Sequence, residues 1–118
     1  MKYKLPKTLK LDIKKWRCGK NSKKKKNRCG IGETLLKNIE GYMCCLGQFS
    51  KQAGVSDILD KSIPDHNRIR GLNSNLISDC VEINDDEGIS VKEKIKSLDK
   101  ILKKAGYKLK IVNARYIP

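Results

Sequence analysis

The amino-acid sequence predicts an α+β fold: one small domain in which two or three helices pack on a short antiparallel or mixed sheet. Three observations predict it. Apolar residues alternate with polar ones near both ends of the chain, within Thr8–Ile13 and Tyr107–Ile111. Three stretches between these ends carry apolar residues at helical spacing. The length of 118 residues suits a single domain, which we expect to span residues 1–118.

The N-terminal element is predicted to be a strand. Its apolar residues occupy alternate positions, which are Tyr3, Leu5, Leu9, Leu11 and Ile13. Pro6 interrupts this pattern, so the continuous strand is expected over Thr8–Ile13 at most. The same stretch also presents apolar residues at helical spacing as far as Trp16, so a helix is the alternative interpretation.

A first helix is predicted over residues 43–53. Its apolar stripe consists of Tyr42, Leu46, Phe49 and Ala53. Gly54 follows at the place of a C-cap, where glycine takes the left-handed conformation at little cost. Before this helix, Thr34–Lys37 is a candidate for a short strand.

A second helix is predicted around a stripe of Leu76, Cys80 and Ile83. Asn73 or Ser74 is suited to be its N-cap. The sequence therefore indicates a core position for Cys80, as is usual for a free cysteine on an apolar stripe.

The third helix has the clearest local signal. Ser90 and Glu93 match the capping box, in which each side chain bonds the backbone N–H of the other residue. An apolar stripe then runs to Ala105, and Gly106 ends the helix. The alternation in Tyr107–Ile111 predicts a terminal strand with lysines on its wet face.

Positive charge is concentrated in the N-terminal quarter of the chain. Residues 1–30 contain thirteen Lys or Arg and one acid, whereas residues 31–118 contain fourteen Lys or Arg and twelve acids. The densest part, Lys14–Arg28, has nine positive charges and no acid. A lysine run cannot be buried, so we expect an exposed basic loop at residues 19–29 that attracts polyanions.

The candidate binding residues come from this basic stretch. Those expected to contact nucleic acid or an acidic partner are Lys14, Lys15, Arg17, Lys20, Lys23, Lys24, Lys25, Lys26 and Arg28. Lysine is a point charge rather than a bidentate reader of guanine, so such binding should depend weakly on base sequence. Trp16 is interpreted as a core residue, with base stacking or a hot spot as the alternative. Tyr116 is a second candidate hot spot.

The five cysteines do not form a recognisable metal or catalytic motif. Their odd number, without a secretory signal in Met1–Lys15, favours a reducing compartment. Cys18 and Cys29 are far apart and Cys44–Cys45 are adjacent, unlike the paired knuckles of structural zinc sites. A thiol nucleophile would need the single histidine, His66, as its base. We therefore expect no enzyme activity, no metal and no cofactor.

Phosphate-loop and calcium motifs are also incomplete. Gly19-Lys20 is followed by Asn21 where a phosphate-binding loop requires Ser or Thr. The acidic stretch Asp79–Glu87 lacks the spacing of a calcium loop. We interpret that stretch as a polar loop leading to the Ser90 cap.

One segment resembles a known group. The residues GYMCCLG, Gly41–Gly47, are similar to a G-x-M-C-C-L-G segment of small uncharacterised proteins from phages and prophages. In that group a helix follows and ends near Q-x-G, here Gln52–Gly54. Trp16–Gly19 and Ile83–Asp86 look similar too, whereas the lysine-rich stretch has no counterpart in the pattern. The resemblance implies a viral or prophage setting and no catalytic activity.

The sequence thus predicts a phage-type accessory protein that acts by binding. The expected partner is nucleic acid or an acidic host protein, in the host cytoplasm and without a membrane segment. The alternative is an inhibitor that recognises the face of a host enzyme or defence complex through an apolar hot spot. A zinc-dependent or thiol-dependent protein is a further alternative.

Overall fold

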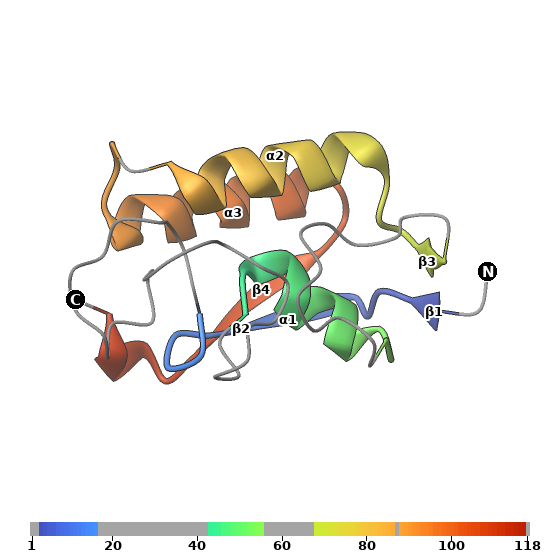
Figure 1. Ribbon diagram of the computed structural model, residues 1–118, viewed down its shortest axis with the longest axis horizontal. Helices are drawn as coiled ribbons and strands as arrows, with labels where there is room; N and C mark the ends of the chain where they lie inside the picture. The colour runs from blue at the N-terminus through green and yellow to red at the C-terminus, as the bar shows by residue number, and fades with distance from the viewer. Residues whose placement is uncertain (1–2, 17–42, 56–67, 87, 118) are drawn as a thin grey trace.

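Three helices and four short strands make up the described part of the chain. A computed structural model describes residues 3–16, 43–55, 68–86 and 88–117. The elements are β1 (Tyr3–Lys4), β2 (Thr8–Asp12), α1 (Cys45–Gln52), β3 (Ile69–Arg70), α2 (Ser74–Asp85), α3 (Val91–Lys104), β4 (Lys108–Val112) and the 3-10 helix η1 (Ala114–Tyr116). Figure 1 shows α2 and α3 side by side on one side of the strands, with α1 next to β2. The expected α+β class, helices packed on a small sheet, is therefore confirmed.

Both described sheets are parallel, so the expectation of an antiparallel or mixed sheet is wrong. β1 pairs with β3, and β2 pairs with β4 in a register that sets Thr8 opposite Lys108 and Asp12 opposite Val112. The connection from β2 to β4 includes all three helices, and the antiparallel pair α2–α3 returns the chain to the end where β2 began. Parallel strands need a long crossover connection of this kind, whereas an antiparallel pair can be closed by a short turn.

The alternation predicted for the N-terminal strand is confirmed. Leu9 and Leu11 are fully buried and Lys10 between them is exposed. These leucines belong to one continuous core that also takes side chains from all three helices, as expected for a single domain. The apolar stripes predicted for the helices lie on this core in the described residues, except that Ala105 at the end of the third stripe is exposed and Tyr42 lies outside the described residues. Cys80 is completely buried in the core.

The predicted helix ends are also confirmed. Asn73 is the N-cap of α2, and Ser90 accepts a hydrogen bond from the Glu93 N–H at the start of α3. Gly54 and Gly106 follow α1 and α3 with positive φ angles of 107° and 92°. The short strand suggested at Thr34–Lys37 lies outside the described residues.

Two glutamines of α1 occupy one edge of the β2–β4 sheet. Gln48 accepts from the Asp12 N–H at 2.7 Å and donates to the Asp12 carbonyl at 3.1 Å. Gln52, one turn later, makes the same two bonds with Lys10, both at 2.7 Å. Because the two side chains replace the hydrogen bonds of a neighbouring strand, this edge of β2 is closed to further pairing.

Replacing Gln48 with leucine should destabilise the protein by about 1–3 kcal/mol, because the Asp12 N–H and carbonyl lose their partners in a poorly solvated position. Gln48 is 5% exposed, so water cannot readily replace the amide. Urea denaturation measures the change. Exposed Lys51 on the same helix provides the control, and Lys51→Leu should change the free energy of unfolding by less than about 0.5 kcal/mol. Equal losses in the two variants would contradict the role of Gln48.

None of the helices in the described ranges has both the length and the apolar character that crossing a membrane requires.

Candidate functional site

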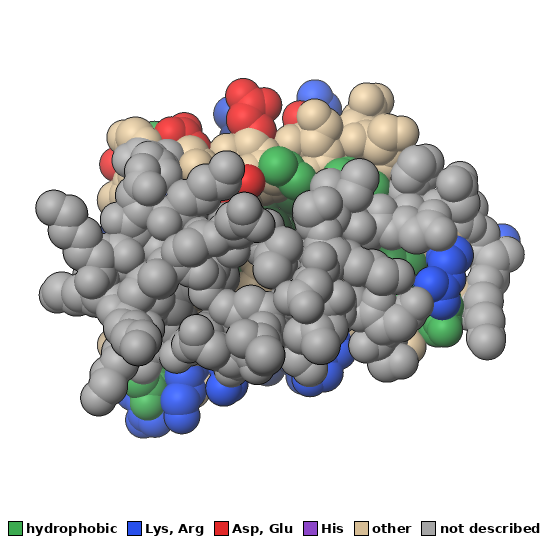
Figure 2. Space-filling view, viewed as in Figure 1, with side chains coloured by type: hydrophobic (Ala, Val, Ile, Leu, Met, Phe, Trp, Pro, Cys, Tyr) green, Lys and Arg blue, Asp and Glu red, His purple; other side chains and the backbone are tan. Residues whose placement is uncertain are grey.

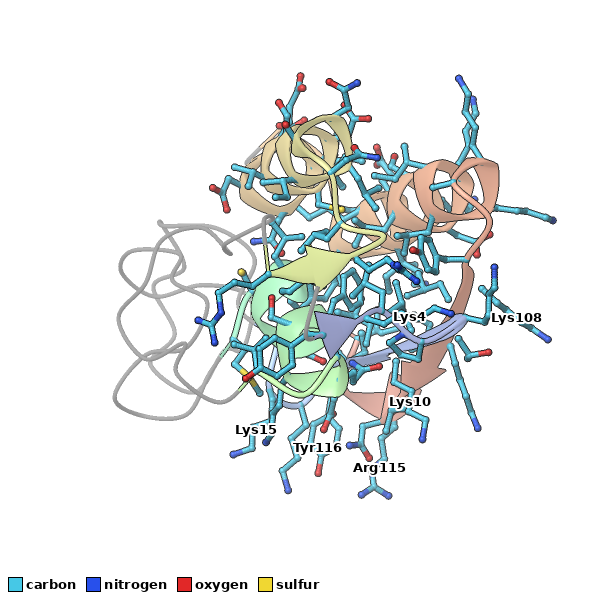
Figure 3. All side chains as sticks on the ribbon, turned by 90° about the vertical axis from the view of Figure 1, so that its right-hand side faces the viewer. Lys4, Lys10, Lys15, Lys108, Arg115 and Tyr116 are labelled. Atoms are coloured by element: carbon cyan, nitrogen blue, oxygen red, sulfur yellow. The ribbon has the colours of Figure 1, made fainter. Side chains whose placement is uncertain are left out.

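Strands β2 and β4 present lysines on the sheet face opposite the helices. Lys10 and Lys110 are exposed and lie directly opposite each other in the parallel register. Exposed Lys14, Lys15 and Arg115 extend this surface at the carboxyl ends of the two strands. Figure 3 shows the side chains of Lys10, Lys15 and Arg115 leaving the sheet on the same side. We call these five residues the basic sheet face.

The basic sheet face brings like charges together. Lys10 and Lys110 form a cross-strand pair, an arrangement that costs free energy when both residues carry the same charge. Asp12 follows Lys10 by two residues in β2, so it lies on the same face of the sheet as Lys10. One of its carboxylate oxygens accepts hydrogen bonds from the Lys14 N–H at 3.0 Å and from Asn113 Nδ2 at 2.8 Å. This carboxylate therefore organises the local backbone.

The bond from Asn113 positions the end of the basic sheet face. Asn113 follows β4 with φ 58° and ψ 44°, a left-handed conformation that asparagine tolerates better than most residues. The chain then turns into η1, which carries Arg115 and Tyr116. The hydrogen bond between Asn113 and Asp12 thus links this turn to the end of β2. It helps to hold Tyr116 near Lys14, which follows β2.

Tyr116 lies between two cations of the basic sheet face. The Lys14 ammonium is 5.7 Å from the centroid of the tyrosine ring, and the Arg115 guanidinium is 5.2 Å from it. Both distances are within the range of cation–π attraction. The ring is half-buried, with an apolar side against the core. An aromatic ring among cations is a common feature of surfaces that hold nucleic acid.

A group of acidic side chains in the described part of the chain lies on another side of the molecule. Asp79, Glu82 and Asp85 lie on α2, which has no Lys or Arg, and exposed Asp86 follows directly. Figure 2 shows acidic side chains over α2 and lysines or arginines along the opposite edge of the molecule. The expectation of a polar loop over Asp79–Glu87 is therefore wrong for its first part, because residues 79–85 are helical.

Trp16 belongs to the core, which contradicts the stacking or hot-spot role considered for it. Its side chain has 0% exposed surface. The indole N–H donates to Asn84 Oδ1 at 2.7 Å, and the same oxygen accepts from the Cys45 N–H at 3.1 Å. The buried Lys94 ammonium donates to the Asn84 backbone carbonyl at 2.8 Å. Asn84, on α2, thus bonds Trp16, the first residue of α1 and a lysine of α3. No ring face of Trp16 is open to a base.

The described thiols are buried and poorly suited to catalysis. Cys44, Cys45 and Cys80 are free and buried. Burial raises the pKa of Cys44 from 9.0 to about 12, and burial also raises the pKa of Cys45 well above its ordinary value. The thiolate, which is the reactive form, is therefore disfavoured at neutral pH. Among the residues described, no three His, Cys, Asp or Glu side chains are grouped to hold a metal ion.

The raised pKa of Cys44 makes the protein less stable in alkali. An unfolded thiol loses its proton near pH 9, whereas the folded one keeps it to about pH 12. The unfolded state thus binds fewer protons between these values, and the free energy of unfolding falls as the pH rises, by about 1.4 kcal/mol per pH unit for one thiol.

Cys44→Ser should remove this contribution of Cys44. Cys44 is the N-cap of α1, and its sulfur accepts from the Gly47 N–H at 3.4 Å. Serine is a preferred N-cap and does not titrate in this range. We expect similar stability at pH 7 and a shallower alkaline loss, measured by urea denaturation between pH 7 and pH 10. An unchanged pH dependence would show that the Cys44 proton is not linked to folding.

Few of the sequence-predicted site residues lie in the described ranges. Lys14 and Lys15 are exposed just after β2, and their contact with a partner stays a prediction. Trp16 and Tyr116 are also described, whereas the remaining candidates lie outside the described residues: Arg17, Lys20, Lys23, Lys24, Lys25, Lys26, Arg28, Cys18, Cys29 and His66. The same is true of the basic loop at residues 19–29. Sequence reasoning missed Lys10, Lys110 and Arg115 as site residues, although the alternation of lysines in both strands was visible.

Comparison of the chain with protein-family models, curated proteins and solved structures found no significant match. The viral or prophage setting implied by Gly41–Gly47 stays a prediction.

Proposed function

We propose that this protein binds the phosphate backbone of nucleic acid through its basic sheet face, without catalysing a reaction. The observation that carries the proposal is the pairing of Lys10 with Lys110 in direct register. A polyanion on this surface would relieve the repulsion between the two ammonium groups and release its own counterions. The acids on α2 lie on another side, so they do not compete for the lysines.

The chemistry of the surface favours backbone contacts over base recognition. Four of its five cations are lysines, which act as point charges. The protein should therefore bind unrelated base sequences with similar affinity, as non-specific binders do. Tyr116 supplies a half-buried ring at one end of the surface, where a base of a single strand could stack beside Arg115.

Fluorescence anisotropy with labelled oligonucleotides tests the proposal. At about 50 mM salt we expect dissociation constants in the micromolar range or tighter for duplexes of two unrelated sequences, and similar values for both. Absence of binding to duplex and single strand at this salt concentration would overturn the proposal. A strong preference for one sequence would contradict the backbone mode.

A further inference from the structure

The two edges of the β2–β4 sheet differ in a way that indicates a second binding site. The edge of β2 is closed, because Gln48 and Gln52 of α1 bond its outward backbone groups. The sheet has only two strands in the described part of the chain, so the outer edge of β4 faces no strand there. Figure 3 shows β4 at the margin of the described elements, with β2 on its inner side.

Two hydrogen bonds establish which backbone groups of β4 face outward. The Lys108 N–H donates to the Lys7 carbonyl at 2.9 Å, and the Ile13 N–H donates to the Val112 carbonyl at 3.0 Å. Alternate residues of a parallel strand bond to the same neighbour. Lys108, Lys110 and Val112 therefore face β2. The N–H and carbonyl groups of Leu109 and Ile111 point away from it, at the spacing that an added strand requires.

The side chains of β4 indicate the chemistry of such a strand. Leu109 and Ile111 are half-buried against the core, so a neighbouring strand could cover their exposed parts with apolar side chains. Lys108 and Lys110 are exposed on the other face, where neighbouring acidic side chains would form cross-strand ion pairs. A second copy of β4 would instead set lysines beside these lysines.

We propose that the outer edge of β4 binds an extended segment of a partner protein in which acidic and apolar residues alternate. The added strand would bond the outward groups of Leu109 and Ile111 and place its acids beside Lys108 and Lys110. This proposal does not rest on nucleic-acid binding, because its main contacts are the backbone groups of Leu109 and Ile111. Lys110 belongs both to this site and to the basic sheet face.

Amide hydrogen exchange of the full chain, followed by NMR, tests it without a destabilising variant. The probe is a short capped peptide of alternating glutamate and valine. The Leu109 and Ile111 amides should exchange rapidly in the free protein and slowly with the peptide. The Lys110 amide, which bonds β2, should be protected in both states and serves as the internal control. A matched peptide, N-methylated on the residues whose amides would meet β4, should bind at least about tenfold more weakly.

Any of the following four outcomes would overturn the proposal. Protection of Leu109 and Ile111 in the free protein at every concentration would show that the edge is already covered. Protection that grows with protein concentration would assign the edge to a second copy. Equal binding of the methylated peptide would show charge attraction without strand addition. No protection by the peptide would show that the edge does not accept a strand of this chemistry.

Discussion

Replacing Asn84 with leucine should lower the free energy of unfolding by about 2–5 kcal/mol. The side-chain oxygen of Asn84 accepts from the Trp16 indole at 2.7 Å and from the Cys45 N–H at 3.1 Å. Asn84 is 1% exposed and both of its partners are completely buried, so water cannot replace the lost acceptor. Each unsatisfied buried donor costs about 1–3 kcal/mol. Urea denaturation followed by circular dichroism measures the loss.

Two further variants separate this mechanism from a general loss of packing. Asn75→Leu introduces the same change at an exposed position of α2 and should cost less than about 0.5 kcal/mol. Trp16→Phe removes the indole donor, so Asn84→Leu should cost about 1–2 kcal/mol less in that background. Strictly additive losses would contradict the shared hydrogen bond as the origin of the effect.

Replacing both Lys10 and Lys110 with glutamine should weaken binding to duplex nucleic acid by up to about 60-fold at about 0.1 M salt. Each lysine that contacts a phosphate contributes about eightfold at this salt concentration, because its contact releases a counterion. The two ammonium groups lie opposite each other on exposed strand positions. Their removal should leave stability unchanged or raise it by a few tenths of a kcal/mol. Fluorescence anisotropy and urea denaturation of the same preparation measure both quantities.

The matched control places the same change of charge on α3. Lys96 and Lys100 are exposed, and their helix lies on the side of the sheet opposite the basic sheet face. Lys96→Gln with Lys100→Gln should weaken binding by less than about threefold, from reduced long-range attraction alone. Equal losses in the two double variants would mean that net charge, rather than the basic sheet face, determines binding.

Local signals in the sequence predicted most described elements correctly. Ser90 with Glu93, and Gly54 and Gly106, marked helix ends because capping depends on residues within one turn of each other. The alternation around Leu9 predicted a strand for a similar reason, since burial of one face needs only a period of two. Strand direction depends instead on how distant segments are connected, and the parallel pairing of β2 with β4 was missed.

The residues of the basic sheet face could not be grouped from the sequence for the same reason. Lys10 and Lys110 are separated by 99 other residues, and their proximity follows only from the register of β2 against β4. Arg115 is brought near them by the turn at Asn113 and its bond to Asp12. Trp16 was ambiguous for a related reason: the partner that satisfies its indole, Asn84, lies on a distant helix.

The salt dependence of nucleic-acid binding tests the central claim most directly. If the five cations of the basic sheet face contact phosphates, the logarithm of the association constant should fall with the logarithm of salt concentration with a slope of about −4 to −5 or steeper. In the Lys10→Gln, Lys110→Gln variant the slope should be shallower by about 2, and in the α3 control it should be unchanged. A slope near zero for the unaltered protein, or the same slope in all three proteins, would contradict the account.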